Sequence, residues 1–296
     1  MTPSTSKQAF LASLTIVFAL ALASCGSKPT PIPVPTITIL PTVSATSVPP
    51  AISVNGEDIS MAEFQAELAR YQQAQIALGD TVSQEAAVQT VRNDLVDTLL
   101  LEQGAASKNF VVDDATLQAR VDALAAQVGG VDALAAWETA HGYTDADFRS
   151  GLRRQIAAAW MRDQITASVP ATAEQVHVKQ ILLYNEAEAQ TDLGLLQAGA
   201  DFNTLAAGND PVAKGELGWF PRGYLPSQAI EDAAFALQPG QFSAIIKDDT
   251  GYHILYLVEL APSRQLSPDA LLTLQQRSVQ SWLTQHHEQS TILFAP

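Results

Sequence analysis

Two polar side chains stand within apolar strand patterns in the second half of the sequence, and they are the first candidates for chemistry. In "VHVKQILLY", residues 176–184, the Gln180 amide shares a strand face with valine, leucine and tyrosine, because side chains alternate along a strand. His253 alternates with leucines in "GYHILYLVEL". A buried amide or imidazole loses stability unless it is hydrogen-bonded. Each of the two side chains therefore either orients other groups in a functional site or forms its hydrogen bonds within a core.

Other forms of chemistry lack their sequence signatures. There is no G-x-S-x-G, no H-E-x-x-H and no P-loop, the motifs of common hydrolases and nucleotide-binding sites. His177, His286 and His287 show no metal-like spacing, so we expect surface positions for them. A net charge of −15 argues against nucleic-acid binding and against electrostatic docking on anionic lipid. We expect neither nucleic acid nor a metal as a partner.

Composition suits a soluble chain with one or two cores, since 47% of the 296 residues are hydrophobic and 16% are charged. The single cysteine, Cys25, excludes an internal disulfide and a thiolate metal cluster. It ends "LASC", after Lys7 and the apolar run "AFLASLTIVFALALA". That run is short for a membrane span and suits a signal peptide.

"LASC" followed by glycine resembles a bacterial lipobox, which implies cleavage before Cys25 and attachment of lipid to its sulfur. On this interpretation residues 1–24 are a lipoprotein signal peptide and the mature chain is tethered outside the cell membrane. An uncleaved anchor helix, or an ordinary secretory signal with a chance cysteine, is the alternative. Residues 25–50 are rich in proline and threonine and are expected to form an extended linker.

Residues 51–170 are expected to form a helical domain after a short initial strand. "ISVNGEDIS" predicts a strand with a turn at Asn55-Gly56, and Ser60 with Glu63 predicts a capping box at the first helix. Four more helical runs follow, in residues 84–107, "DDATLQARVDALAAQVGG", "DALAAWETAHG" and "TDADFRSGLRRQIAAAWMRDQI". An amphipathic helix over residues 268–288 is expected to complete this domain.

Residues 172–262 predict a compact α+β unit that Pro262 closes. The expected strands are 176–184, 216–220, 242–247 and 252–260, and the expected helices are 186–197, 202–207 and 228–236.

This unit resembles the parvulin-type (PpiC, rotamase) peptidyl-prolyl isomerases. The matching stretches are "VHVKQILLYNEAEA", "LLQAGADFNTLAAG", "DPVAKGELGWFPRGYLP", "AIEDAAFALQPGQFSAII" and "TGYHILYLVEL". The resemblance implies a four-stranded antiparallel sheet flanked by helices. Together with the lipobox, the helical region and the final helix, it further resembles the SurA/PrsA class of extracytoplasmic foldases, in which the helical region is a chaperone module.

The resemblance implies a set of site residues. Gln180 and His253 stand where the family has the two histidines of a central hydrogen-bond network, and Asp210 lies near an aspartate or cysteine position. The implied substrate-binding residues are Leu225 on the floor of the proline pocket, Ile230 where phenylalanine is usual, and Phe235. In the family the strand of Gln180 lies beside that of His253, so we expect the amide to hydrogen-bond the imidazole.

The implied reaction is rotation about X–Pro bonds in unfolded or nascent exported polypeptides, with a lipid anchor to the membrane. Rotation breaks no bond, so it needs no cofactor or metal; an apolar pocket favours the less dipolar twisted amide. Each site residue also has a structural alternative: Leu225, Ile230 and Phe235 as core, His253 as a satisfied core histidine, and Asp210 as a turn former before proline.

Two departures from the family pattern bear on activity. Glutamine at Gln180 keeps a donor and an acceptor but does not titrate, and Ile230 gives a smaller wall for the proline ring. We therefore expect weakened isomerase activity on a retained fold. The alternatives are a catalytically inactive holdase that binds unfolded exported clients, and a lipoprotein that scaffolds envelope partners.

Overall fold

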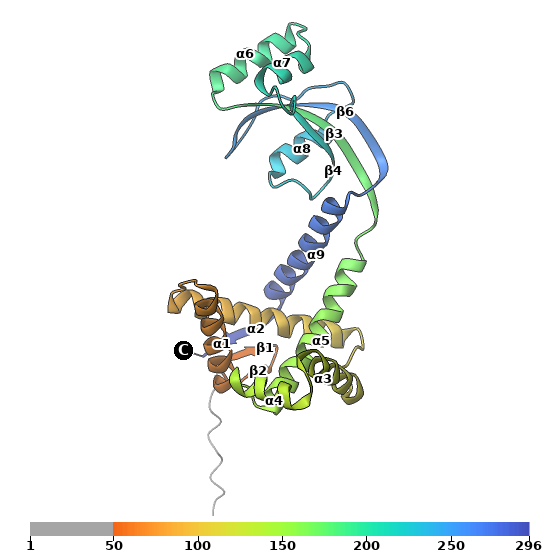
Figure 1. The fold of residues 1–296 in the computed structure, drawn as a ribbon. Coiled ribbons are helices and arrows are strands. Elements are labelled where there is room, and N and C mark those ends of the chain that lie inside the picture. Colours follow the sequence, from red (N-terminus) through yellow and green to blue (C-terminus); the bar gives the residue numbers. More distant parts are fainter. Residues whose placement is uncertain (1–49, 296) are drawn as a thin grey trace, which may run out of the picture. The chain divides into compact units, whose positions relative to one another are not determined.

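The computed structural model of the chain describes residues 50–295 (Figure 1). The predicted signal peptide, Cys25 and all but the last residue of the predicted linker lie outside the described residues. Within residues 50–295, every helix is either too short or too polar to cross a bilayer.

The helical region begins with a β-hairpin. Its strands β1 and β2 are joined by Asn55 and Gly56, whose φ angles of 55° and 85° suit a tight hairpin turn. Five helices follow, and a ninth helix and a last strand come from the end of the chain. The bounds are β1 (Ile52–Val54), β2 (Glu57–Ile59), α1 (Met61–Leu78), α2 (Gln84–Ser107), α3 (Asp114–Val128), α4 (Val131–Ala140), α5 (Asp145–Ala167), α9 (Pro268–Gln289) and β7 (Ile292–Phe294).

Local capping residues set the ends of these helices. The Ser60 side chain accepts a hydrogen bond from the Glu63 N–H, as expected of an N-cap. The other half of the predicted capping box is absent from the described contacts, because the Glu63 carboxylate pairs with Arg154 instead. Gly129 ends α3 in the left-handed conformation that suits a glycine C-cap.

Two apolar clusters hold the helical region together. One gathers α2 to α5 around buried residues such as Leu101 and Met161. The other joins the hairpin to α1 and α2 around Ile52 and Leu99. Trp282 of α9 packs against both clusters. Strand β7, which the sequence did not predict, pairs with β1 and completes a three-stranded sheet of order β2-β1-β7.

The second region is the expected α+β unit, with a four-stranded antiparallel sheet of order β4-β3-β6-β5. Helix α8 packs on one face of the sheet, and α6 with α7 covers the other (Figure 1). The bounds are β3 (Thr172–Leu183), α6 (Glu186–Gln197), α7 (Phe202–Asn209), β4 (Glu216–Pro221), α8 (Gln228–Ala236), β5 (Ile246–Asp248) and β6 (Gly251–Gln265).

Strand bounds differ from the sequence prediction at several places, and β3 begins at Thr172 and not at Val176. Tyr184 lies beyond the end of β3 and is 81% exposed. The predicted strand over residues 242–247 is reduced to β5 and one isolated bridge at Phe242. Pro262 does not close the unit, because β6 runs past it to Gln265. The register with β3 shifts at this point, and a proline is tolerated where an irregular ladder needs no N–H donor.

Candidate functional site

Gln180 and His253 meet on adjacent strands. Leu255 lies opposite Gln180 in the β3–β6 register, and His253 is two residues away along β6, on the same face. The His253 ring nitrogen Nδ1 lies 2.9 Å from the Gln180 amide oxygen. The predicted hydrogen bond between the two side chains is therefore confirmed. His253 is buried, with 3% of its surface exposed, so this bond satisfies a group that water does not reach.

The other side of the imidazole contacts two residues that sequence reasoning missed. Nε2 lies 3.0 Å from an Asp248 carboxylate oxygen and 3.0 Å from the Thr250 hydroxyl. Asp248 ends β5 and Thr250 lies in the turn before β6, where its hydroxyl and N–H donate to Asp248 at 2.6 and 2.8 Å. The hydrogen bond from the Thr250 hydroxyl, aided by those from its N–H and from His253, holds the pKa of Asp248 well below its usual range.

Protein partners thus occupy both nitrogens of the His253 ring. A ring held in this way is oriented firmly and is not presented as a free general base. A His253 ring fixed at both nitrogens suits a reaction that needs polar groups in fixed positions and no proton transfer. The signal for Asp248 was present in "DDTGYH", since an aspartate two residues before a threonine favours a local turn.

An apolar cluster lies on the same face of the sheet. Leu255, which faces Gln180 across the strands, belongs to the cluster that contains Ile230 and contacts Leu225. Ile230 is 7% exposed on α8, and Leu225 is partly buried in the loop between β4 and α8. The structure therefore brings Gln180, His253, Leu225 and Ile230 to one side of the sheet.

A buried carboxylate fixes the loop that carries Leu225. Glu231, 7% exposed, accepts hydrogen bonds from the backbone N–H groups of Gly223, Tyr224 and Leu225 at 2.7, 3.1 and 3.3 Å. Hydrogen bonds to an ionised acceptor are stronger than neutral ones. The sequence analysis assigned no role to Glu231, because backbone donors on an irregular loop leave no periodic pattern in the sequence.

Asp210 builds a loop in the structure. Its carboxylate accepts hydrogen bonds from the N–H groups of Val212, Ala213 and Gly215 at 3.2, 2.9 and 3.3 Å. The bond from Ala213 in particular lowers the pKa of Asp210. Among the described contacts, this carboxylate does not reach the side chains of the Gln180–His253 pair. The loop meets Gln180 through the backbone instead, where the Gln180 N–H donates to the Gly215 carbonyl at 2.7 Å.

Phe235 packs in the cluster on the α8 face. Its ring lies edge-on to Phe220 at 6.2 Å and beneath the Arg222 guanidinium at 4.2 Å. These contacts give Phe235 a packing role; its contact with substrate stays a prediction. Within residues 50–295, no set of three histidine, cysteine or acidic side chains is grouped as a metal site would require.

Two family models match the chain. Residues 8–162 match the SurA-like N-terminal domain, and residues 169–271 match the PPIC-type PPIase domain. The first match spans more than half of the chain, and the second contains Gln180, His253, Leu225 and Ile230.

Named relatives carry similar descriptions. Chaperone SurA of Methylobacillus flagellatus is 30% identical over 203 residues, which cover 55% of this chain and 45% of that protein. Foldase protein PrsA 4 of Bacillus cereus is 34% identical over 125 residues, covering 40% and 44%. The chain thus spans less than half the length of these relatives. A solved structure of peptidylprolyl isomerase PrsA from Bacillus cereus is 22% identical, covers 80% of this chain and 87% of that one, and has a TM-score of 0.46.

Proposed function

Because the chain belongs to the family with a SurA-like N-terminal domain and also carries a PPIC-type PPIase domain, we propose that it is an extracytoplasmic peptidyl-prolyl cis-trans isomerase that assists the folding of exported proteins. Its substrates are X–Pro bonds in unfolded or nascent polypeptides. The uncatalysed rotation faces a barrier of roughly 20 kcal/mol and takes tens of seconds.

The observation that carries this proposal is the buried Gln180–His253 hydrogen bond beside the apolar cluster of Leu225 and Ile230. An apolar surface holds the proline ring and favours the twisted amide, which is less dipolar than the planar one. The fixed imidazole and amide orient the polar end of the site. No bond is broken, so the chemistry needs neither a nucleophile nor a cofactor.

A protease-coupled assay on an X–Pro peptide tests this proposal with the purified full-length chain. We expect acceleration above the uncatalysed rate, and loss of that acceleration in the double variant Leu225→Ala, Ile230→Ala. The matched control is Leu195→Ala with Val212→Ala, which removes similar side chains that are 44% and 93% exposed. A wild-type rate equal to the uncatalysed rate would reject the isomerase.

A second candidate is a holdase that binds unfolded clients without useful catalysis. The presence of glutamine at Gln180 and of a branched aliphatic side chain at Ile230 favours it, since both differ from the residues usual in parvulins. Suppression of the aggregation of an unfolded protein by a chain that lacks isomerase activity would support this function. Failure of both assays would leave the envelope scaffold.

The proposed location is the outer side of the cell membrane, with lipid on Cys25 as the anchor. A single cysteine placed after an apolar run and before glycine supports it. Substitution Cys25→Ser is expected to move the protein from the membrane fraction to the soluble fraction of cells. An unchanged membrane fraction would argue against lipidation at this residue.

A further inference from the structure

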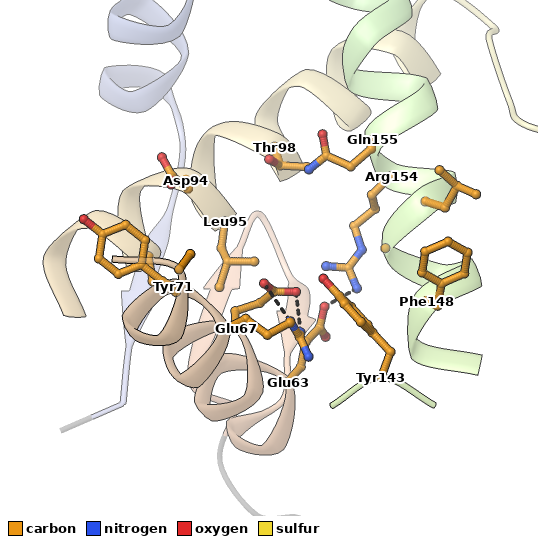
Figure 2. Close-up of a pocket in the computed structure, with 15 residues that line it drawn as sticks. Glu63, Glu67, Tyr71, Asp94, Leu95, Thr98, Tyr143, Phe148, Arg154 and Gln155 are labelled. Carbon is orange, nitrogen blue, oxygen red and sulfur yellow. Dashed lines mark hydrogen bonds and ion pairs between the residues drawn. The ribbon is translucent and has the colours of Figure 1, made fainter. Parts of the chain in front are cut away.

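The helical region contains a cavity that the proposed isomerase site does not use. It has a volume of about 470 Å³ and lies between α1, α2 and α5 (Figure 2). Ligand sites typically have volumes of roughly 300 to 1,000 Å³. Apolar and aromatic side chains form most of its wall: Tyr71, Val91, Leu95, Tyr143, Phe148 and Leu152. One bulky side chain and its neighbouring peptide units fit such a space.

The wall is held in shape by charged groups that are already paired. Arg70 of α1 forms an ion pair with Glu67 at 2.5 Å and donates to the Gly142 carbonyl at 3.3 Å. Its guanidinium also lies 3.8 Å from the centre of the Tyr143 ring. These contacts join α1 to the loop before α5 (Figure 2). The cavity is therefore preformed, which lowers the entropic cost of binding.

Three polar side chains on the wall retain hydrogen-bonding capacity. Arg154, whose side chain is 16% exposed, has one polar contact within the described residues, the ion pair with Glu63 at 2.5 Å. A guanidinium carries five N–H donors. The Thr98 hydroxyl and the Gln155 amide also line the cavity (Figure 2), and together they offer hydrogen-bond donors and acceptors to a ligand. An extended polypeptide offers alternating carbonyl and N–H groups that match them, whereas an aliphatic chain leaves them unpaired.

The rim of the cavity carries an excess of negative charge. Asp94 lines the cavity on α2, and both arginines of the wall are paired with glutamates. Partial burial, and secondarily the nearby Asp97, raise the pKa of Asp94. A cation placed beside a carboxylate whose pKa is raised stabilises the charged form of that carboxylate.

We propose that this cavity binds a segment of unfolded polypeptide by inserting one bulky apolar side chain, with a lysine or arginine of the same segment beside Asp94. The inference rests on the proposed role in protein folding and specifies the client chemistry of the helical region. It requires no proline, so this site acts on segments that the isomerase site does not select.

Fluorescence anisotropy with the full chain and three labelled proline-free peptides tests the proposal. The peptides share one sequence with Trp flanked by lysines, Trp flanked by glutamates, or Ala flanked by lysines. We expect the first to bind most tightly and the other two about ten-fold more weakly. Asp94→Asn should abolish the preference for lysine, and Asp132→Asn on the exposed surface of α4 should not. Equal binding of all three peptides would overturn the proposal.

Gly151 offers a way to fill the cavity without damage to the fold. It lies on α5 at the cavity wall, and a Cβ added there meets no atom within 4 Å. Gly151→Leu should abolish peptide binding, because the added side chain occupies the cavity, while leucine is the better helix former. Gly194→Leu on α6 is the matched control, since its Cβ is equally unobstructed and it lies outside the cavity.

The results of these experiments distinguish a failure of the cavity proposal from a failure of the isomerase proposal. Unchanged binding by Gly151→Leu, or equal loss in Gly194→Leu, would overturn the cavity as the site. A labelled fatty acid that binds the wild type but not Gly151→Leu, without any peptide binding, would assign the cavity to an apolar chain and overturn the proposal. Absence of isomerase activity in every variant, with cavity-dependent peptide binding retained, would reject the isomerase and support the inference.

Discussion

Replacement of Glu231 by glutamine should disorder the loop that carries Leu225 while leaving the rest of the fold in place. The two carboxylate oxygens accept three backbone N–H groups: one oxygen bonds Gly223 at 2.7 Å, and the other bonds Tyr224 and Leu225 at 3.1 and 3.3 Å. Glutamine keeps one acceptor oxygen and turns an NH₂ group toward the remaining donors. At least one hydrogen bond to a charged acceptor is therefore lost in a site that is 7% exposed.

The magnitude follows from these contacts. A hydrogen bond to a charged group contributes about 1.5 to 3 kcal/mol, and the donor left behind loses its partner. We expect Glu231→Gln to lower the free energy of unfolding by about 2 to 3 kcal/mol. Because the loop then samples positions away from the apolar cluster, kcat/KM for an X–Pro peptide should fall by about ten- to hundred-fold.

The neighbouring residue provides a matched control. Asp232 is the next carboxylate along α8, but it is exposed and its contact with Arg222 is 3.6 Å long. Surface ion pairs contribute little, so Asp232→Asn should change stability by less than about 1 kcal/mol and leave kcat/KM unchanged. Urea unfolding and the protease-coupled assay measure both quantities. Equal effects of the two substitutions, or a wild-type profile for Glu231→Gln, would refute the reasoning.

Three further substitutions test the site. Gly215→Ala should destabilise the protein by at least about 2 kcal/mol and reduce activity, because φ is +72° and the new Cβ would collide with the Gln180 carbonyl; an unchanged melting temperature would contradict this. Asp248 has a lowered pKa in the folded state, so its stabilising effect is complete above its unfolded pKa of about 3.9 and is lost as the pH falls further. The stability difference between wild type and Asp248→Asn should therefore shrink from pH 7 to pH 3, and a constant difference in urea unfolding would argue against the hydrogen-bond explanation. Ile230→Phe should raise kcat/KM by enlarging the proline contact and lower stability by about 1 to 3 kcal/mol through overpacking; decreased activity with normal stability would show that Ile230 is no part of the pocket.

Local patterns predicted much of this molecule. Strand alternation and the family resemblance placed Gln180 beside His253, and the structure confirms their hydrogen bond. The predicted bounds of α6 and α8 agree with the structure to the residue. These features depend on residues close in sequence or on a matched motif.

The missed features depend on partners that local periodicity does not encode. Strand β7 has three residues and exists only because β1 pairs with it. Glu231 acts through backbone donors that any residue type would supply. The strand beyond Pro262 persists because an irregular register places the proline where no donor is required. Asp210 was assigned from the family resemblance, and its carboxylate instead accepts hydrogen bonds from the backbone of its own loop.

The pairing of β1 with β7 has a consequence for the order of folding. The Thr291 N–H donates to the Asn55 side chain across 236 residues, next to the ladder that joins the two strands. The α+β unit, by contrast, draws all four strands of its sheet from one continuous middle segment of the chain. A chain that emerges from its N-terminus completes that middle segment first, since contacts between nearer residues form faster. The sheet of the helical region is completed only when β7 has been made and pairs with β1, so we expect this pairing among the last steps of folding.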